Sequence, residues 1–167
     1  MKSIRNILIA AFLTITVCSA IVYTACNKDH CNNVICQNGG ACNGGNCTCV
    51  VGFEGIRCET LSRDKFIYTF NGGDTCSNSD SIYDQYPVKF LAVLTNPVEI
   101  NMKNFLDNVN DSALCTMQSP DSFSFIGSNN STTYTGSGTL HNDTLRLTYH
   151  VQQDTFSYNC MYVGGIN

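Results

Sequence analysis

The sequence predicts a mainly β protein, with a small disulfide-rich unit followed by an antiparallel β-meander or barrel, after a signal peptide helix. Three observations lead to this prediction. Residues 7–25 form an apolar run behind a basic start, six cysteines fall within residues 31–58, and residues 66–167 repeatedly alternate apolar with polar side chains. A chain of 167 residues has room for one or two small domains.

Composition and charge narrow the function classes. Hydrophobic residues make up 43% and charged residues 13% of the chain, a mixture that folds. The formal net charge is −4, and removal of Lys2 and Arg5 with the first 25 residues would take it to −6. An acidic chain without a Lys/Arg cluster argues against nucleic acid as a partner. Eleven cysteines indicate an oxidising compartment.

Residues 1–25 are expected to be a lipoprotein signal peptide. Basic Lys2 and Arg5 precede the apolar run, and small residues stand near its end, which is the usual pattern of a secretory signal. A run of this length also suffices to cross a bilayer, so a retained membrane anchor is the alternative.

Cys26 is the predicted site of lipid attachment. The stretch Tyr23-Thr24-Ala25-Cys26 resembles a bacterial lipobox, in which small residues precede a cysteine that becomes the lipidated first residue. Several acyl chains on one cysteine anchor a protein stably, which makes the membrane a predicted partner through the lipid anchor. Cys18, which follows the bulky Val17, is a weaker candidate, and a disulfide role for Cys26 is the alternative.

Residues 26–30, the lipidated N-terminal tether, indicate where in the cell the protein is located. Lys28 followed by Asp29 resembles part of the signal that sends lipoproteins of Bacteroidota to the cell surface. The expected location is therefore the outer membrane at the cell surface, outside the cytoplasm.

Residues 31–58 are expected to form one small domain held by disulfides. The spacing is Cys31-x4-Cys36-x5-Cys42-x4-Cys47-x-Cys49-x8-Cys58. A unit this small cannot build a sufficient hydrophobic core and needs crosslinks. Six cysteines allow 15 pairings, and spacing alone does not choose among them.

The same residues resemble an EGF-like module. The resemblance rests on Cys36-Gln37-Asn38-Gly39-Gly40-Ala41-Cys42, Cys47-Thr48-Cys49 and Gly52-Phe53-Glu54-Gly55-Ile56-Arg57-Cys58. It implies the pairs Cys31–Cys42, Cys36–Cys47 and Cys49–Cys58. Gly39-Gly40 suits a hairpin that needs positive φ, and Gly52 and Gly55 suit tight turns.

The sequence offers little support for a zinc or calcium site in this unit. Cys47-x-Cys49 is too closely spaced for a usual zinc pair. Asn27 and Asp29 echo the acidic start of calcium-binding EGF modules, but only four residues separate Cys42 from Cys47, and six or more oxygen ligands are not visible. We expect no metal and no cofactor.

After a linker at residues 59–65, residues 66–167 predict an all-β domain. Apolar and polar residues alternate with period two in residues 98–103 and 144–151. In three further segments, apolar residues stand two apart and would lie on one face of a strand: Phe66, Tyr68 and Phe70; Phe123 and Phe125; and Phe156, Tyr158, Cys160 and Tyr162. Residues 88–94, apolar on both faces, predict a more buried strand. The turn signals are Gly72-Gly73-Asp74, Asn96-Pro97, residues 108–111, Ser119-Pro120-Asp121, residues 127–130, His141-Asn142-Asp143 and Gln152-Gln153-Asp154. About eight strands result.

A sheet of eight strands avoids exposed edges by closing into a barrel. Closure makes the first and last strands neighbours, which predicts a Cys76–Cys160 disulfide and leaves Cys115 free; pairing of Cys115 with either one is the alternative. Gly136-Ser137-Gly138 suggests a bend of the kind that closes barrels. With a Cys-bearing last strand, this part resembles the small lipocalin-like domains that follow an EGF-like module in lipoproteins of Bacteroidota.

The function expected from the sequence is non-enzymatic. His30, His141 and His150 have no nucleophile placed with them, and Cys115 has no indicated base, so we expect no catalytic residues. We expect a surface protein for binding or adhesion, or a spacer, with an extracellular protein or glycan as partner. The alternative is a carrier of a small apolar ligand in the barrel, lined by Phe66, Tyr68, Phe123, Phe125, Tyr149, Phe156 and Tyr158.

Overall fold

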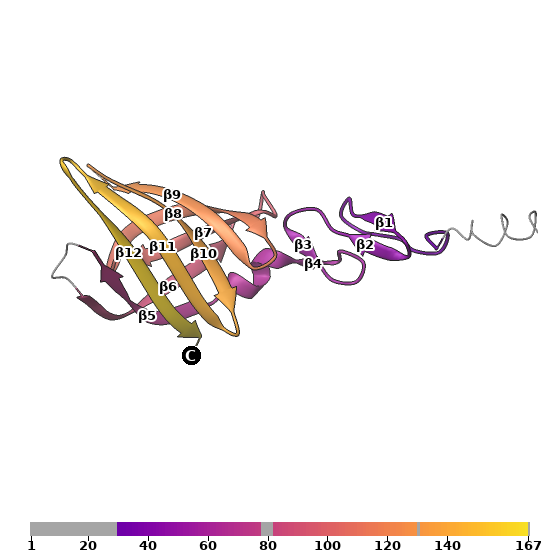
Figure 1. Cartoon of the computed structure of the whole chain (residues 1–167), viewed down its shortest axis with the longest axis horizontal. Coiled ribbons are helices and arrows are strands. Elements are labelled where there is room, and N and C mark those ends of the chain that lie inside the picture. Colours follow the sequence, from indigo (N-terminus) through magenta and orange to yellow (C-terminus); the bar gives the residue numbers. More distant parts are fainter. Residues whose placement is uncertain (1–29, 78–81, 130, 167) are drawn as a thin grey trace, which may run out of the picture.

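Two β structures follow each other along an elongated molecule (Figure 1). The computed structural model describes residues 30–77, 82–129 and 131–166. The first structure is a disulfide-bonded unit with the short strands β1 (Ala41–Asn43), β2 (Asn46–Thr48), β3 (Phe53–Glu54) and β4 (Thr60–Leu61). A 3-10 helix, η1 (Ser62–Phe66), then leads into the second structure, a barrel.

The barrel is closed and antiparallel. Its strands are β5 (Thr69–Cys76), β6 (Ile82–Ala92), β7 (Glu99–Phe105), β8 (Asn108–Ser119), β9 (Ser122–Asn129), β10 (Thr132–His141), β11 (Thr144–Gln153) and β12 (Phe156–Ile166). Each strand pairs with the next, and β12 pairs with β5 to complete the circle. The eight-stranded barrel predicted from the sequence is therefore confirmed. Because the chain runs up and down, η1 and the β6–β7, β8–β9 and β10–β11 turns share one end, which we call the near end.

Alternating side chains fill the barrel. On β11, Leu145, Leu147, Tyr149 and Val151 are buried, whereas the residues between them are largely exposed. The same alternation on the other strands gives one cluster of twenty buried residues inside the barrel. This cluster is the hydrophobic core of the protein, and burial of its apolar surface drives folding.

Two glycines of β10 make room for rings. A Cβ on Gly138 would lie 2.1 Å from Phe123 Cζ, and one on Gly136 would lie 2.8 Å from Phe125 Cζ. Both rings belong to β9, which pairs with β10 residue for residue here. Rings that cover the backbone of a neighbouring glycine are a known device of curved sheets. The Gly136-Ser137-Gly138 segment thus stays within a strand and accommodates the core.

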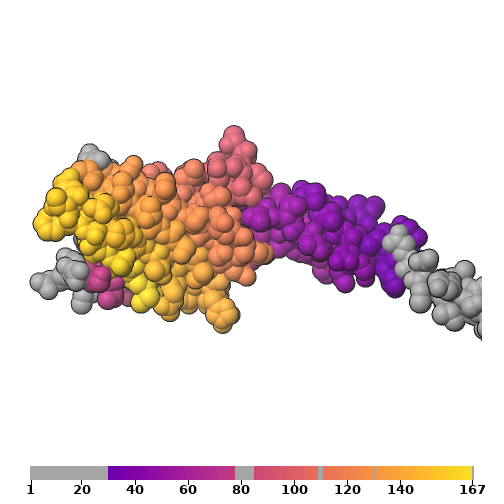
Figure 2. Space-filling view, turned by 45° about the horizontal axis from the view of Figure 1, so that its top comes forward, coloured from indigo at the N-terminus to yellow at the C-terminus, as the bar shows by residue number. Residues whose placement is uncertain are grey.

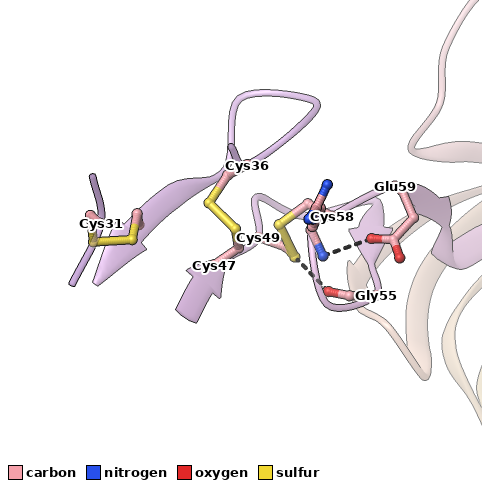
Figure 3. The surroundings of a disulfide bond; sticks show 9 residues. Cys31, Cys36, Cys47, Cys49, Gly55, Cys58 and Glu59 are labelled. Carbon is pink, nitrogen blue, oxygen red and sulfur yellow. Dashed lines mark hydrogen bonds between the residues drawn. A yellow bond between two sulfur atoms is a disulfide. The ribbon is translucent and has the colours of Figure 1, made fainter. Parts of the chain in front are cut away.

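Three disulfides hold the first unit, and they are the pairs that the resemblance implied. Cys31–Cys42, Cys36–Cys47 and Cys49–Cys58 follow one another along the unit, as Figure 3 shows. Gly39, Gly52 and Gly55 have φ of 78°, 96° and 98° and lie in turns. The hairpin predicted at Gly39-Gly40 was wrong, because the hairpin of this unit joins β1 to β2 and turns at Gly44-Gly45. We call residues 31–58 with these bridges the disulfide unit.

A fourth disulfide, Cys76–Cys160, joins the two strands at which the barrel closes. The two residues are directly opposed in the β5–β12 register, and their Cα atoms are 4.0 Å apart. Cys115 is buried and free, so the prediction holds over its alternatives.

The predicted linker proves to be folded. Residues 59–65 contain β4 and most of η1, and Ser62 and Arg63 are buried. Phe66 ends η1 and Tyr68 precedes β5, so the strand inferred from the common phase of Phe66, Tyr68 and Phe70 was wrong. The charged residues Arg63 and Lys65 misled the prediction, because they bind to the barrel rather than pointing freely into solvent.

Three predicted turns lie inside strands. Gly72-Gly73-Asp74 belongs to β5, where the pairing with β6 shifts register, and residues 127–129 belong to β9. Residues 108–111 begin β8, and the turn before them consists of Leu106 and Asp107, both at φ 54°. Glycine and aspartate are typical of turns, but Gly72 is required in the strand, because a Cβ there would lie 2.0 Å from Val163 O.

The segment 88–94 is not buried on both faces. Val88 and Phe90 point into the core, but Leu91 is exposed and Leu94, beyond the end of β6, is 90% exposed. The apolar run therefore combines one inward row with residues that face solvent.

The predicted signal peptide, Cys26 and most of the tether lie outside the described residues. Among the residues that are described, no helix is long and apolar enough to span a membrane.

We predict that the Cys76–Cys160 bridge is the largest single covalent contribution to barrel stability. Replacing both cysteines with alanine opens a loop of 84 residues and should lower the free energy of unfolding by about 4–5 kcal/mol. Urea unfolding followed by circular dichroism measures this loss. The Cys115→Ala variant is the control, because it removes a thiol without opening a loop. Equal stability of the double variant and the parent would contradict the prediction.

Candidate functional site

The near end of the barrel is where the disulfide unit is attached. Arg63 of η1 inserts between carbonyl groups of the β6–β7 connection: its Nη1 donates to Val93 O at 2.5 Å and also to Asn96 O, with Glu99 O at 3.4 Å. Hydrogen bonds from a charged donor are stronger than neutral ones. Arg63 thereby fixes η1 to this connection.

Phe66 closes the same end from within. Its ring is fully buried and lies 5.3 Å from the ring of Phe123 and 6.4 Å from that of Phe90, measured between centroids. Edge-to-face contact with Phe123 adds to the burial of apolar surface. The last residue of η1 is thus part of the barrel core, and η1 seals the near end.

Further contacts join the disulfide unit directly to the barrel. Lys65 Nζ lies 2.7 Å from Glu54 Oε2 on β3 and 2.7 Å from Asp121 Oδ1 in the β8–β9 turn. Partial burial disfavours the charged amine, but these two carboxylates outweigh it and raise the pKa of Lys65. Ser62 N donates to Gly52 O at 2.9 Å, and Gly52 packs against Val98.

Together these contacts form what we call the junction: Arg63, Lys65 and Phe66 with their partners on both sides. Its contacts come from η1, from β3 and from two turns of the barrel. Figure 2 shows the disulfide unit seated end-on against the barrel. The arrangement holds two β structures in one fixed orientation.

The other half of the barrel interior carries polar groups. Asp74 on β5 is 1% exposed and accepts a hydrogen bond from the Tyr86 hydroxyl. Burial raises the pKa of Asp74 more than the hydrogen bond from Tyr86 lowers it. The Tyr149 hydroxyl lies near the same carboxylate without completing a hydrogen bond of normal geometry, and burial together with the charge of Asp74 raises the pKa of Tyr149.

A second carboxylate, Asp111 on β8, lies in the same half. It accepts hydrogen bonds from Asn129 and, at 3.1 Å, from the Tyr134 hydroxyl. Burial, with the charge of Asp111, raises the pKa of Tyr134 to about 12. Phe105 separates the two polar groups, because its ring packs on those of Tyr134 and Tyr149. Hydrogen bonding of this kind is what permits polar groups inside a barrel.

The aromatic residues predicted to line a ligand pocket divide into three groups. Phe66, Phe123, Phe125 and Tyr149 are buried and pack on one another or on neighbouring rings. Tyr158 is half-buried and packs against the core. Tyr68 and Phe156 are 51% and 75% exposed, so they do not line the interior. The carrier interpretation needs rings around an open space, whereas the buried rings are in mutual contact.

The groups considered for catalysis are not brought together. His141 is exposed and hydrogen-bonds to Asn142, and His150 is half-buried and hydrogen-bonds to Asn159. Cys115 is buried, and burial raises its thiol pKa, which disfavours the nucleophilic thiolate. Within the described ranges, no group of three or more His, Cys, Asp or Glu is arranged to hold a metal ion.

Comparison with known proteins finds no family model that matches this chain, and no curated protein or solved structure with significant similarity.

Sequence reasoning missed Arg63, Asp74 and Asp111. For the two aspartates a signal existed: Phe70, Gly72 and Asp74 share one phase on β5, as Asp111, Ala113 and Cys115 do on β8, so the inward row continues through each carboxylate. For Arg63 no local pattern exists, because its partners are carbonyl groups 30 or more residues away.

We predict that Asp74 makes stability decrease with rising pH. Because its pKa is higher in the folded than in the unfolded chain, the folded state loses stability as pH rises from about 4 through the raised value. Asp74→Asn keeps the shape and a hydrogen-bond acceptor for Tyr86 and removes this titration. The unfolding free energy of the variant minus that of the parent should therefore grow with pH across this window.

Urea unfolding between pH 4 and pH 8 measures this difference. Asp143→Asn is the matched control, because it makes the same substitution at an exposed turn carboxylate. A pH-independent difference for Asp74→Asn would contradict the prediction.

Proposed function

We propose that this chain is a non-enzymatic, lipid-anchored cell-surface protein whose EGF-like module serves as a rigid spacer and contact surface beneath a lipocalin-like barrel. In this proposal Cys26 carries the lipid, and the disulfide unit comes next in the chain. The barrel is then held away from the outer membrane, where it and the module meet an extracellular protein or glycan.

The junction is the observation that supports this proposal most strongly. A flexible tether would need no buried arginine, no bridging lysine and no ring in the barrel core, yet residues 62–66 provide all three. A spacer transmits position only if both of its ends are fixed. Here one end is fixed by the junction, and the three disulfides keep the unit itself in shape.

The surface of the disulfide unit supports a contact role. Ile35 and Ile56 are 75% and 87% exposed, and Val50 and Val51 are also exposed. Exposed apolar side chains on a small crosslinked unit provide contact area that costs little conformational entropy on binding, because the backbone is already fixed.

The anchor is tested by Cys26→Ser in the full chain, expressed in a bacterium with an outer membrane. In the parent, intact mass should show loss of residues 1–25 and the addition of acyl chains, and protease added to intact cells should remove the protein. In the variant, acylation should be absent, since serine offers no thiol. Cys18→Ser is the matched control and should be acylated like the parent.

A parent mass that retains residues 1–25 would overturn lipidation in favour of a retained membrane anchor. Full protection from protease on intact cells, with the expected acylated mass, would instead overturn the surface location.

A further inference from the structure

A pocket of about 480 Å³ opens at the near end of the barrel, beside the junction. Its polar lining consists of Lys65, Asp121, Asn142 and Asp143, and Tyr68, Leu140 and Ile166 supply the rest. We call it the rim pocket. Its volume falls in the range of small-ligand sites and suits about one or two sugar rings.

The walls of the rim pocket are held by backbone hydrogen bonds. Leu140 N donates to Asp121 O at 3.0 Å, which ties β10 to the β8–β9 turn. Ile166 N donates to Asp143 O at 3.2 Å, which ties the end of β12 to the β10–β11 turn. Asn142 and Asp143 form this tight turn at φ 46° and 60°. The pocket is therefore formed before any ligand arrives, and binding requires little ordering.

Tyr68 supplies an accessible ring on a fixed backbone. Its N donates to Phe66 O at 2.7 Å, and its O accepts from Phe90 N at 3.2 Å, so the residue is held between η1 and β6. It is nevertheless 51% exposed. The neighbouring residues Phe66 and Phe70 are buried in the core, whereas the Tyr68 side chain remains partly uncovered.

The charges of the rim pocket select against anions. Its lining has two carboxylates, Asp121 and Asp143, and one amine, Lys65. That amine is already engaged by Asp121 and by Glu54, each at 2.7 Å. The pocket therefore has a net negative charge and no unengaged cation among its lining residues, so an acidic ligand would be repelled.

We propose that the rim pocket binds a neutral or amino-bearing saccharide, with Tyr68 against the apolar face of a sugar ring and with Asp121, Asn142 and Asp143 receiving its hydroxyl or amino groups. A sugar presents one C–H face and a rim of groups that both donate and accept. An aromatic ring beside carboxylate and amide side chains meets both requirements. This inference rests on the proposed binding function and names glycan as the partner class.

The test is binding of four disaccharides to the detergent-extracted full chain, by saturation-transfer NMR and calorimetry. Cellobiose and mannobiose are the neutral probes, the glucosamine disaccharide is the amino probe, and digalacturonic acid is the acidic probe. We expect a neutral or amino disaccharide to bind at millimolar concentration or better and digalacturonic acid not to bind. Tyr68→Ala should weaken binding at least tenfold, and Tyr68→Phe should change it less than threefold.

Phe156→Ala is the matched control, because Phe156 is an exposed ring at the opposite end of the barrel. Its binding should equal that of the parent. Absence of binding by all neutral and amino probes, equal binding of the acidic probe, or unchanged affinity in a folded Tyr68→Ala protein would overturn the proposal. These results leave acylation and protease accessibility of the parent unaffected, so failure here is distinguishable from failure of the anchor.

Discussion

The rest of the structure depends on residues 62–66 being held against the near end of the barrel. Arg63 donates hydrogen bonds to carbonyl groups of the β6–β7 connection, and Phe66 completes the core. One short 3-10 helix therefore covers the near end of the barrel. The same five residues follow the disulfide unit after the short strand β4, which pairs with β3 of that unit. Because the helix is bonded on its barrel side and Lys65 bridges to β3, the orientation of the unit is set by barrel packing.

The interior of the closed barrel has an apolar half and a polar half. The half next to η1 is apolar and is packed with phenylalanine rings, among them Phe66, Phe90 and Phe123. The opposite half contains Asp74 and Asp111 with their tyrosine partners. Burial of a carboxylate is costly, and these hydrogen bonds reduce the cost without removing it. The Cys76–Cys160 bridge lies at this polar half, where it fixes the two strands that close the circle.

The sequence predicted the barrel because period-two alternation with turns is a strong local signal. The three disulfides of the first unit followed from the resemblance of its residues to an EGF-like module, since spacing alone leaves 15 pairings open. The Cys76–Cys160 pair followed from closure of the barrel. The predictions were wrong where one local pattern fits two different structures. Gly72 and Gly127 were assigned to turns, yet they are strand residues close to a neighbouring backbone or side chain. The polar composition around Arg63 predicts a linker. The segment is folded instead, because Arg63 and Lys65 bind residues that are distant in the sequence.

The most direct test of the account is backbone ¹⁵N relaxation on a soluble form comprising residues 27–167. If the junction is rigid, one anisotropic diffusion tensor should describe the disulfide unit and the barrel together, and amides of residues 60–66 should show no fast internal motion. Separate rotational correlation times for the two parts, with mobile amides between them, would contradict it.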